Sequence, residues 1–121
     1  MKTVLLIEDD PFLRNLYVDI LKEENINVEI AVDGEEGLKK IQSQDWDLIM
    51  IDIVLPKLDG LQIYKKLKEQ SPEKLKQKIV FLSNLDKNSI IEEIVKEGCD
   101  YLIKSKFNPD EFVNKVKSYL V

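Results

Sequence analysis

The feature that most restricts the fold is a rhythm of short apolar runs and longer helical patterns, repeated about five times along the chain. This rhythm is typical of a parallel sheet with helices on both faces. We expect strands at residues 3–7, 27–31, 48–51, 78–82 and 101–103. The first, third and fourth runs are continuously apolar, as buried strands are, whereas Val28-Glu29-Ile30 alternates like an edge strand. The prediction is an α/β fold with a five-stranded parallel sheet in the order 2-1-3-4-5.

Polar residues mark the expected helix starts. Asp10-Pro11 and Asn108-Pro109 place a capping side chain before a proline, and Asp33 precedes Glu36 at capping-box spacing. The third helix is expected to open near Asp59-Gly60 and the fourth near residues 87–89, while the charged stretch 69–78 is expected to be a surface loop. In the first helix, one apolar stripe is predicted to face the sheet: Phe12, Leu13, Leu16, Tyr17, Ile20 and Leu21.

Composition argues for one domain. A chain of 121 residues with 44% hydrophobic content suits a single core, so we expect one unit over residues 1–121 without an output domain. Net charge is -5 and no segment concentrates Lys and Arg, which argues against binding to nucleic acid or a membrane. The apolar run 4–7 is too short for a signal peptide, and the single Cys99 suits a reducing compartment. A cytoplasmic protein is therefore expected.

The polar residues at the strand ends suggest where the chemistry lies. The chain has no histidine. This excludes catalysis by an imidazole and metal sites with histidine ligands. In a doubly wound, three-layer, flavodoxin-like sandwich, ligands bind beyond the carboxyl ends of the strands. Four of the five expected strands end there in polar residues, namely Glu8-Asp9-Asp10, Asp52, Ser83 and Lys104. Since the first and third strands are neighbours in the expected order, Glu8, Asp9 and Asp52 should share one pocket.

Three clustered carboxylates repel one another unless a cation compensates them. The all-oxygen ligands of Glu8, Asp9 and Asp52 suit Mg²⁺, or alternatively Mn²⁺. An ionised Asp52 can attack phosphorus to form an acyl phosphate, with Lys104 and Ser83 contacting the phosphoryl oxygens. The sequence thus predicts a phosphorylation switch that catalyses its own aspartyl phosphorylation and dephosphorylation without being a conventional enzyme.

Each of these residues also has an ordinary interpretation when it is taken alone. Asp10 is interpreted as a helix cap. Asp52 is compatible with a strand end reaching solvent, Lys104 with a surface lysine and Ser83 with a hydroxyl bonded to local backbone. Their joint placement at neighbouring strand ends is what these separate roles do not predict.

The chain resembles the receiver domain of bacterial two-component response regulators over essentially its full length. The resemblance rests on residues 4–10, 47–60, 79–84 and 98–104, which read VLLIEDD, DLIMIDIVLPKLDG, IVFLSN and GCDYLIK. It implies a stand-alone, chemotaxis-regulator-like member in which Asp52 accepts phosphate from a phosphohistidine. The donor would be a sensor histidine kinase or a histidine phosphotransfer protein. The resemblance also implies Mg²⁺ bound by Glu8, Asp9, Asp52 and the backbone carbonyl of Val54.

Signal output follows from the same resemblance. Ser83 would be the switch hydroxyl and Tyr101 the switch aromatic, which together reshape the face of the fourth helix, fifth strand and fifth helix. Tyr101 is equally compatible with a half-buried aromatic residue on an edge strand. The signal would pass by contact with a downstream protein, from a monomer or a phosphorylation-dependent dimer. The sequence names neither the cognate kinase nor that target.

Three positions depart from the family pattern. Ser105 stands where a proline commonly follows the lysine, which leaves open whether the Lys104–Ser105 peptide is cis. Asn84 replaces a small residue and narrows access to the site. Val54 and Leu85 offer no polar group to orient an attacking water molecule, which predicts a long-lived acyl phosphate.

Two other functions fit part of this pattern. A flavodoxin-like cofactor binder needs a glycine-rich phosphate loop after the first strand, where Glu8-Asp9-Asp10 would repel phosphate. The alternative that stays open is a pseudo-receiver, a protein-binding module that is not phosphorylated.

Overall fold

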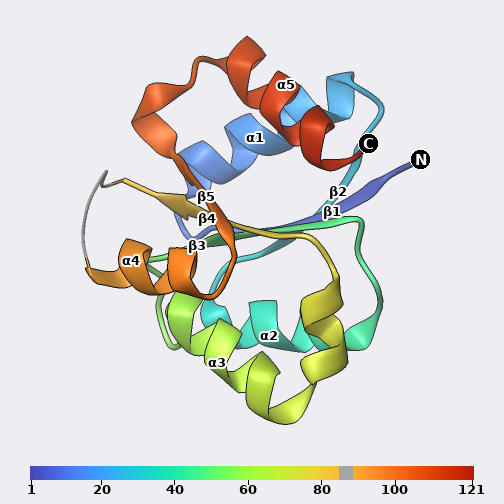
Figure 1. Ribbon diagram of the computed structural model, residues 1–121. Coiled ribbons are helices and arrows are strands. Elements are labelled where there is room, and N and C mark those ends of the chain that lie inside the picture. Colours follow the sequence, from blue (N-terminus) through green and yellow to red (C-terminus); the bar gives the residue numbers. More distant parts are fainter. Residues whose placement is uncertain (85–88) are drawn as a thin grey trace.

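The computed structural model describes residues 1–84 and 89–121, and its centre is a five-stranded parallel sheet (Figure 1). The strands are β1 Thr3–Ile7, β2 Asn27–Ala31, β3 Leu48–Asp52, β4 Ile79–Ser83 and β5 Asp100–Ile103. They lie in the order β2-β1-β3-β4-β5. The predicted α/β class, strand order and parallel pairing are confirmed.

Helices cover both faces of this sheet. The α-helices are α1 Pro11–Glu23, α2 Gly34–Ser43, α3 Gly60–Gln70, α4 Ser89–Lys96 and α5 Pro109–Tyr119, with two short 3-10 helices, η1 Pro72–Lys76 and η2 Lys104–Lys106. Figure 1 shows α1 and α5 on one face and α2, α3 and α4 on the other. Among the described residues, no helix combines the length and hydrophobicity that crossing a lipid bilayer requires.

Two hydrophobic clusters hold the three layers together. On the α1 and α5 side, Tyr17, Leu21, Phe112 and Val116 pack against the sheet. On the other side, the apolar residues of α2, α3 and α4 pack against the opposite faces of β1, β3 and β4. Every residue of β3 and β4 is buried, whereas β2 alternates between exposed and half-buried positions until it ends at the buried Ala31. The central strands of the sheet are therefore buried on both faces, and β2 is an edge strand as predicted.

The expected helix caps are present. The Asp10 carboxylate accepts hydrogen bonds from the backbone N–H groups of Phe12 and Leu13, which confirms its capping role. Asp33 accepts from the Glu36 N–H and so caps α2, but the Glu36 carboxylate accepts from the Val32 N–H, so the capping box predicted there is only half formed. Complete capping boxes form at α3 with Asp59 and at α5 with Asn108. These side chains satisfy amide groups that the first helical turn leaves unpaired.

The sequence prediction was wrong at two places. Phe12 is 74% exposed instead of facing the sheet, because it lies about 140° around α1 from the buried Tyr17. The stretch 69–78 is not only a loop, since α3 continues to Gln70 and η1 follows. Leu75 within η1 packs against the core, which anchors this turn. Leu85 and the residues expected just before Ser89 at the start of the fourth helix lie outside the described residues.

Candidate functional site

The predicted site residues meet at the carboxyl edge of the sheet. Glu8 follows β1, Asp52 ends β3, Ser83 ends β4 and Lys104 follows β5. Within the described part of the chain, Glu8, Asp52 and Ser83 are the buried polar residues, with exposures of 0%, 5% and 4%. Buried carboxylates are costly unless they are paired, so their concentration here requires compensation.

Lys104 supplies that compensation. Its ammonium nitrogen lies 2.6 Å from Glu8 Oε1 and 2.9 Å from Asp52 Oδ2, and the lysine side chain is only 6% exposed. One cation therefore bridges carboxylates from two different strand ends. The burial of all three side chains strengthens this electrostatic interaction relative to a surface ion pair.

The protonation behaviour of the site follows from burial and proximity. Burial raises the pKa of the Glu8 carboxyl, and the neighbouring Asp52 carboxyl adds to the rise, while Lys104 opposes it. Burial alone would lower the pKa of Lys104, but the hydrogen bonds and charges of Glu8 and Asp52 outweigh it and leave that pKa raised. The lysine thus stays charged at neutral pH.

Asp9 completes an acidic cluster beside this ion pair. One carboxylate oxygen from each of Glu8, Asp9 and Asp52 lies within 4.8 Å of the other two, and Asp9 faces solvent. An octahedral Mg²⁺ places its ligand oxygens about 3–4 Å apart, so small side-chain movements bring these oxygens to one ion. The donor set, three hard carboxylates with a solvent opening, fits a divalent cation.

Backbone amides orient both buried carboxylates. The Val54 N–H donates to Asp52 Oδ1 at 3.2 Å, and the Asp10 N–H donates to Glu8 Oε2 at 3.3 Å. Asp52 is therefore held through one oxygen by the backbone and through the other by Lys104. The Val54 side chain is 72% exposed. The role of its carbonyl as a metal ligand stays a prediction.

Arg14 is a residue that sequence reasoning missed. Its Nη1 donates to the backbone carbonyls of Glu8 at 3.2 Å and Asp9 at 3.4 Å. The guanidinium thus braces the segment that carries two of the acidic side chains. A signal was available, because side chains on a helix tilt toward its N-terminus and Arg14 lies one turn after the cap at Asp10.

The other predicted residues are Ser83, Tyr101, Asn84 and Ser105, and the geometry of the site does not test their proposed roles. Ser83 is buried one residue beyond Leu82, which pairs with Asp52 across the sheet. Tyr101 is half-buried on the edge strand β5 and packs against the α4 side of the core, which fits its ordinary interpretation. Its switch role stays a prediction. Asn84 is exposed, and the Lys104–Ser105 peptide is trans.

The family can be read from a match along most of the chain. A family model of the response regulator receiver domain matches residues 4–117. This chain belongs to the response regulator receiver family. The alkaline phosphatase synthesis transcriptional regulatory protein PhoP of Bacillus subtilis is 34% identical over 119 residues, covering 98% of this chain and 48% of PhoP. The response regulator ArlR of Staphylococcus aureus is 29% identical over 99% of this chain and 53% of its own length. This receiver chain thus spans about half the length of these curated relatives.

Solved receiver structures superpose closely on the chain. The receiver domain of Francisella response regulator 1452 has a TM-score of 0.85 and 31% identity, covering 99% of this chain and 97% of its own. The response regulator TrrA of Thermotoga maritima, solved in complex with Mg²⁺-BeF, has a TM-score of 0.81 and 32% identity. That alignment covers 99% of this receiver and 100% of TrrA.

Proposed function

We propose that this receiver domain is a phosphorylation-dependent switch in which Asp52 accepts a phosphoryl group with the help of Mg²⁺. The observation that carries the proposal is the arrangement at the carboxyl edge of the sheet. There the Lys104 ammonium lies between Asp52 and Glu8, with Asp9 beside them. A nucleophilic carboxylate, a fixed cation and a metal-ligand set are the three requirements of phosphoryl transfer to an aspartate.

In the proposed reaction, a carboxylate oxygen of Asp52 forms a bond to phosphorus as the phosphorus–nitrogen bond of the donor's phosphohistidine breaks. The electron pair of the broken bond stays with the imidazole that leaves. Glu8, Asp9, Asp52 and the Val54 carbonyl would hold the Mg²⁺, which when bound neutralises charge on the carboxylates and the phosphoryl oxygens. Lys104 and Ser83 would contact the transferred oxygens through an ammonium and a hydroxyl.

The consequence for signalling is a shift between two packings of the same chain. A phosphoryl group on Asp52 adds charge that Lys104 and Ser83 can contact better in one packing than in the other. Tyr101 would follow this shift on the face formed by α4, β5 and α5. The signal would then pass to a downstream protein through that face, by a monomer or by a dimer that forms on phosphorylation.

The proposed donor is a sensor histidine kinase or a histidine phosphotransfer protein, acting on a receiver in the cytoplasm. We further propose that residues 1–121 act as one receiver unit. The similarity to response regulators supports both points. TrrA, which was solved with Mg²⁺-BeF, supports the choice of metal.

Acetyl phosphate tests the proposal directly. Wild-type protein incubated with Mg²⁺ and acetyl phosphate should gain the mass of one phosphoryl group in intact-protein mass spectrometry. Asp52→Asn should gain none. The control Asp45→Asn changes an 88% exposed carboxylate that precedes β3 and should label like wild type. No adduct on wild type would favour the pseudo-receiver, and an adduct on Asp52→Asn would place the acceptor elsewhere.

A further inference from the structure

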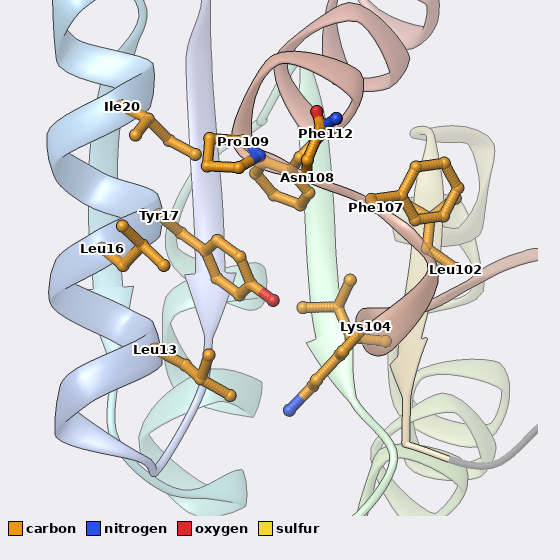
Figure 2. Close-up of a pocket in the computed structure, with 11 residues that line it drawn as sticks. Leu13, Leu16, Tyr17, Ile20, Leu102, Lys104, Phe107, Asn108, Pro109 and Phe112 are labelled. Carbon is orange, nitrogen blue, oxygen red and sulfur yellow. The ribbon is translucent and has the colours of Figure 1, made fainter.

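A cavity of about 180 Å³ lies between α1 and the start of α5, next to the site just described (Figure 2). Its wall is mainly apolar and comes from α1, the ends of β4 and β5, the segment before α5 and the start of α5. The residues used below are Leu16, Tyr17, Ile20, Lys104, Phe107 and Phe112. A cavity of about 150 Å³ with such a lining is large enough to bind benzene.

One polar group points into this space without a partner. Tyr17 is 6% exposed, and its hydroxyl forms no hydrogen bond with the described residues of the chain. Figure 2 shows the hydroxyl directed into the cavity, toward the side chain of Lys104. The buried side-chain polar atom without a partner in the described chain is Arg14 Nε, so the Tyr17 oxygen is not sealed in protein but borders the open space of the cavity. A ligand that enters the cavity can therefore form a hydrogen bond with this hydroxyl.

The orientation of the Tyr17 hydroxyl is fixed by packing. The ring stacks on Phe112 with the centroids 4.4 Å apart and the planes 17° from parallel. This stack holds the ring, so the hydroxyl direction does not have to be ordered when a ligand binds. Burial raises the pKa of Tyr17, which Lys104 partly opposes, and the group is protonated at neutral pH. It can therefore both donate and accept a hydrogen bond.

We propose that this cavity binds a small neutral aromatic alcohol, with its ring among the apolar side chains and its hydroxyl on Tyr17 Oη. The rings of Tyr17, Phe107 and Phe112 favour an aromatic over an aliphatic body. A neutral head group is favoured because Lys104 is already paired with two carboxylates, so an anion would meet an excess of negative charge. The site does not depend on phosphorylation of Asp52, although the Lys104 stem forms part of its wall.

Phenol and toluene provide the test, since they share a ring and differ by a hydroxyl in place of a methyl group. Titration of isotopically labelled wild-type protein, followed by two-dimensional NMR, should give saturable shifts confined to α1 and residues 107–112. We expect phenol to bind at about millimolar concentration, as its few atoms allow. It should bind about fivefold more tightly than toluene, as one added hydrogen bond predicts.

Three variants distinguish binding inside the cavity from binding elsewhere on the chain. Tyr17→Phe should bind the two ligands equally, whereas Tyr119→Phe, which removes a hydroxyl outside the cavity, should keep the preference for phenol. Ile20→Trp at the half-buried rim should block both ligands while leaving the fold unchanged by circular dichroism. Absence of saturable shifts in wild type would overturn the proposal. So would phenol binding to Ile20→Trp with wild-type affinity, a result that holds even if Tyr17→Phe fails to fold.

Discussion

At the scale of single residues, the ion pairs of Lys104 differ from the other ion pairs of the described chain in their burial. The Lys104 side chain is 6% exposed, whereas Lys68, which lies 3.0 Å from Glu97, is 51% exposed. Exposed pairs contribute little to stability, but removing one partner of a buried pair leaves an uncompensated charge. The two lysines therefore form a matched pair for mutation.

Lys104→Met should lower the free energy of unfolding of the metal-free protein by about 3 kcal/mol, because Glu8 and Asp52 lose their cation. Lys68→Met should change it by less than about 1 kcal/mol. Urea denaturation in the presence of a chelator measures both values. Equal losses for the two variants would mean that the buried bridge contributes no special stability.

Val54 bears on the lifetime of the proposed phosphoryl group. Its exposed side chain lies two residues from Asp52 and has no group that could orient water. Val54→Asn should therefore shorten the lifetime of the acyl phosphate severalfold. Mass spectrometry measures this lifetime as the rate at which the phosphoryl mass is lost after acetyl phosphate is removed. Val95→Asn, at an exposed valine of α4, is the control. A wild-type lifetime of only seconds would count against the argument.

Tyr119 gives a pH dependence with a defined sign. Burial and the negative charge of Asp100 raise the pKa of Tyr119 from 10.0 to about 12. The folded state thus favours the protonated phenol, and the stability linked to it is complete below pH 10.0 and is lost as the pH rises toward about 12. Tyr119→Phe should lose less stability than wild type across this interval, measured by urea denaturation at several pH values. Identical losses would contradict the raised pKa.

Some residues of the site could be predicted from the sequence pattern around them, and others could not. Glu8, Asp52, Ser83 and Lys104 were predictable because each stands at the end of an apolar run, where a parallel sheet gathers its ligands. The free hydroxyl of Tyr17 was not predictable, since an apolar stripe predicts which residues are buried but not which polar atoms lack a partner.

At the scale of elements, the segment between β3 and α3 is held against the start of α2. The Gly34 N–H donates to the Pro56 carbonyl at 3.1 Å, and a Cβ atom at Gly34 would lie 1.9 Å from the Leu58 carbonyl oxygen. The approach is too close for any side chain. Glycine at this position therefore allows α2 to support the segment that follows Asp52.

Gly34→Ala should lower the free energy of unfolding by about 2 kcal/mol or more, because the new methyl group meets backbone that cannot move aside. Gly37→Ala in the same helix should cost less, since its Cβ would meet side-chain atoms of Ile7, the nearest at 2.6 Å, and not backbone. Both variants gain helix propensity, which cancels in the comparison. Chemical denaturation measures the free energy of unfolding of both variants. Equal losses would show that the backbone near Gly34 moves aside at little cost.

Element boundaries were less predictable than element order. The sequence placed β1 and β2 at their observed bounds, but β3 extends to Asp52 and β4 begins at Ile79 instead of Lys78. Strand ends depend on which backbone groups find a partner in the neighbouring strand, as Asp52 does opposite Leu82. The hydrophobic pattern of one segment does not contain that information.

At the scale of the whole molecule, a bound metal should add to the stability of the fold, because a ligand that binds only the folded state shifts the unfolding equilibrium. With Mg²⁺ at about ten times its dissociation constant, wild type should gain about 1.4 kcal/mol. Asp9→Asn should lose most of this gain. Asp10→Asn should keep it, since Asp10 caps α1 and lies outside the acidic cluster.

Thermal unfolding with and without Mg²⁺ measures this difference between adjacent aspartates. An equal response of Asp9→Asn and Asp10→Asn would argue against the proposed ligand set.

The architecture itself was predictable because five alternating segments leave few right-handed parallel arrangements. The geometry among the carboxylates was not, since it depends on contacts between residues far apart in the sequence.

The contact between Lys104 and Glu8 joins positions separated by 96 residues, from the first strand end to the last. No shorter stretch of the chain can form it, so a growing polypeptide on the ribosome has an acidic edge without its counterion until β5 has been synthesised and docked. The chain should thus become able to accept a phosphoryl group only after the whole sheet has folded. Incomplete chains should not react with the phosphoryl donor.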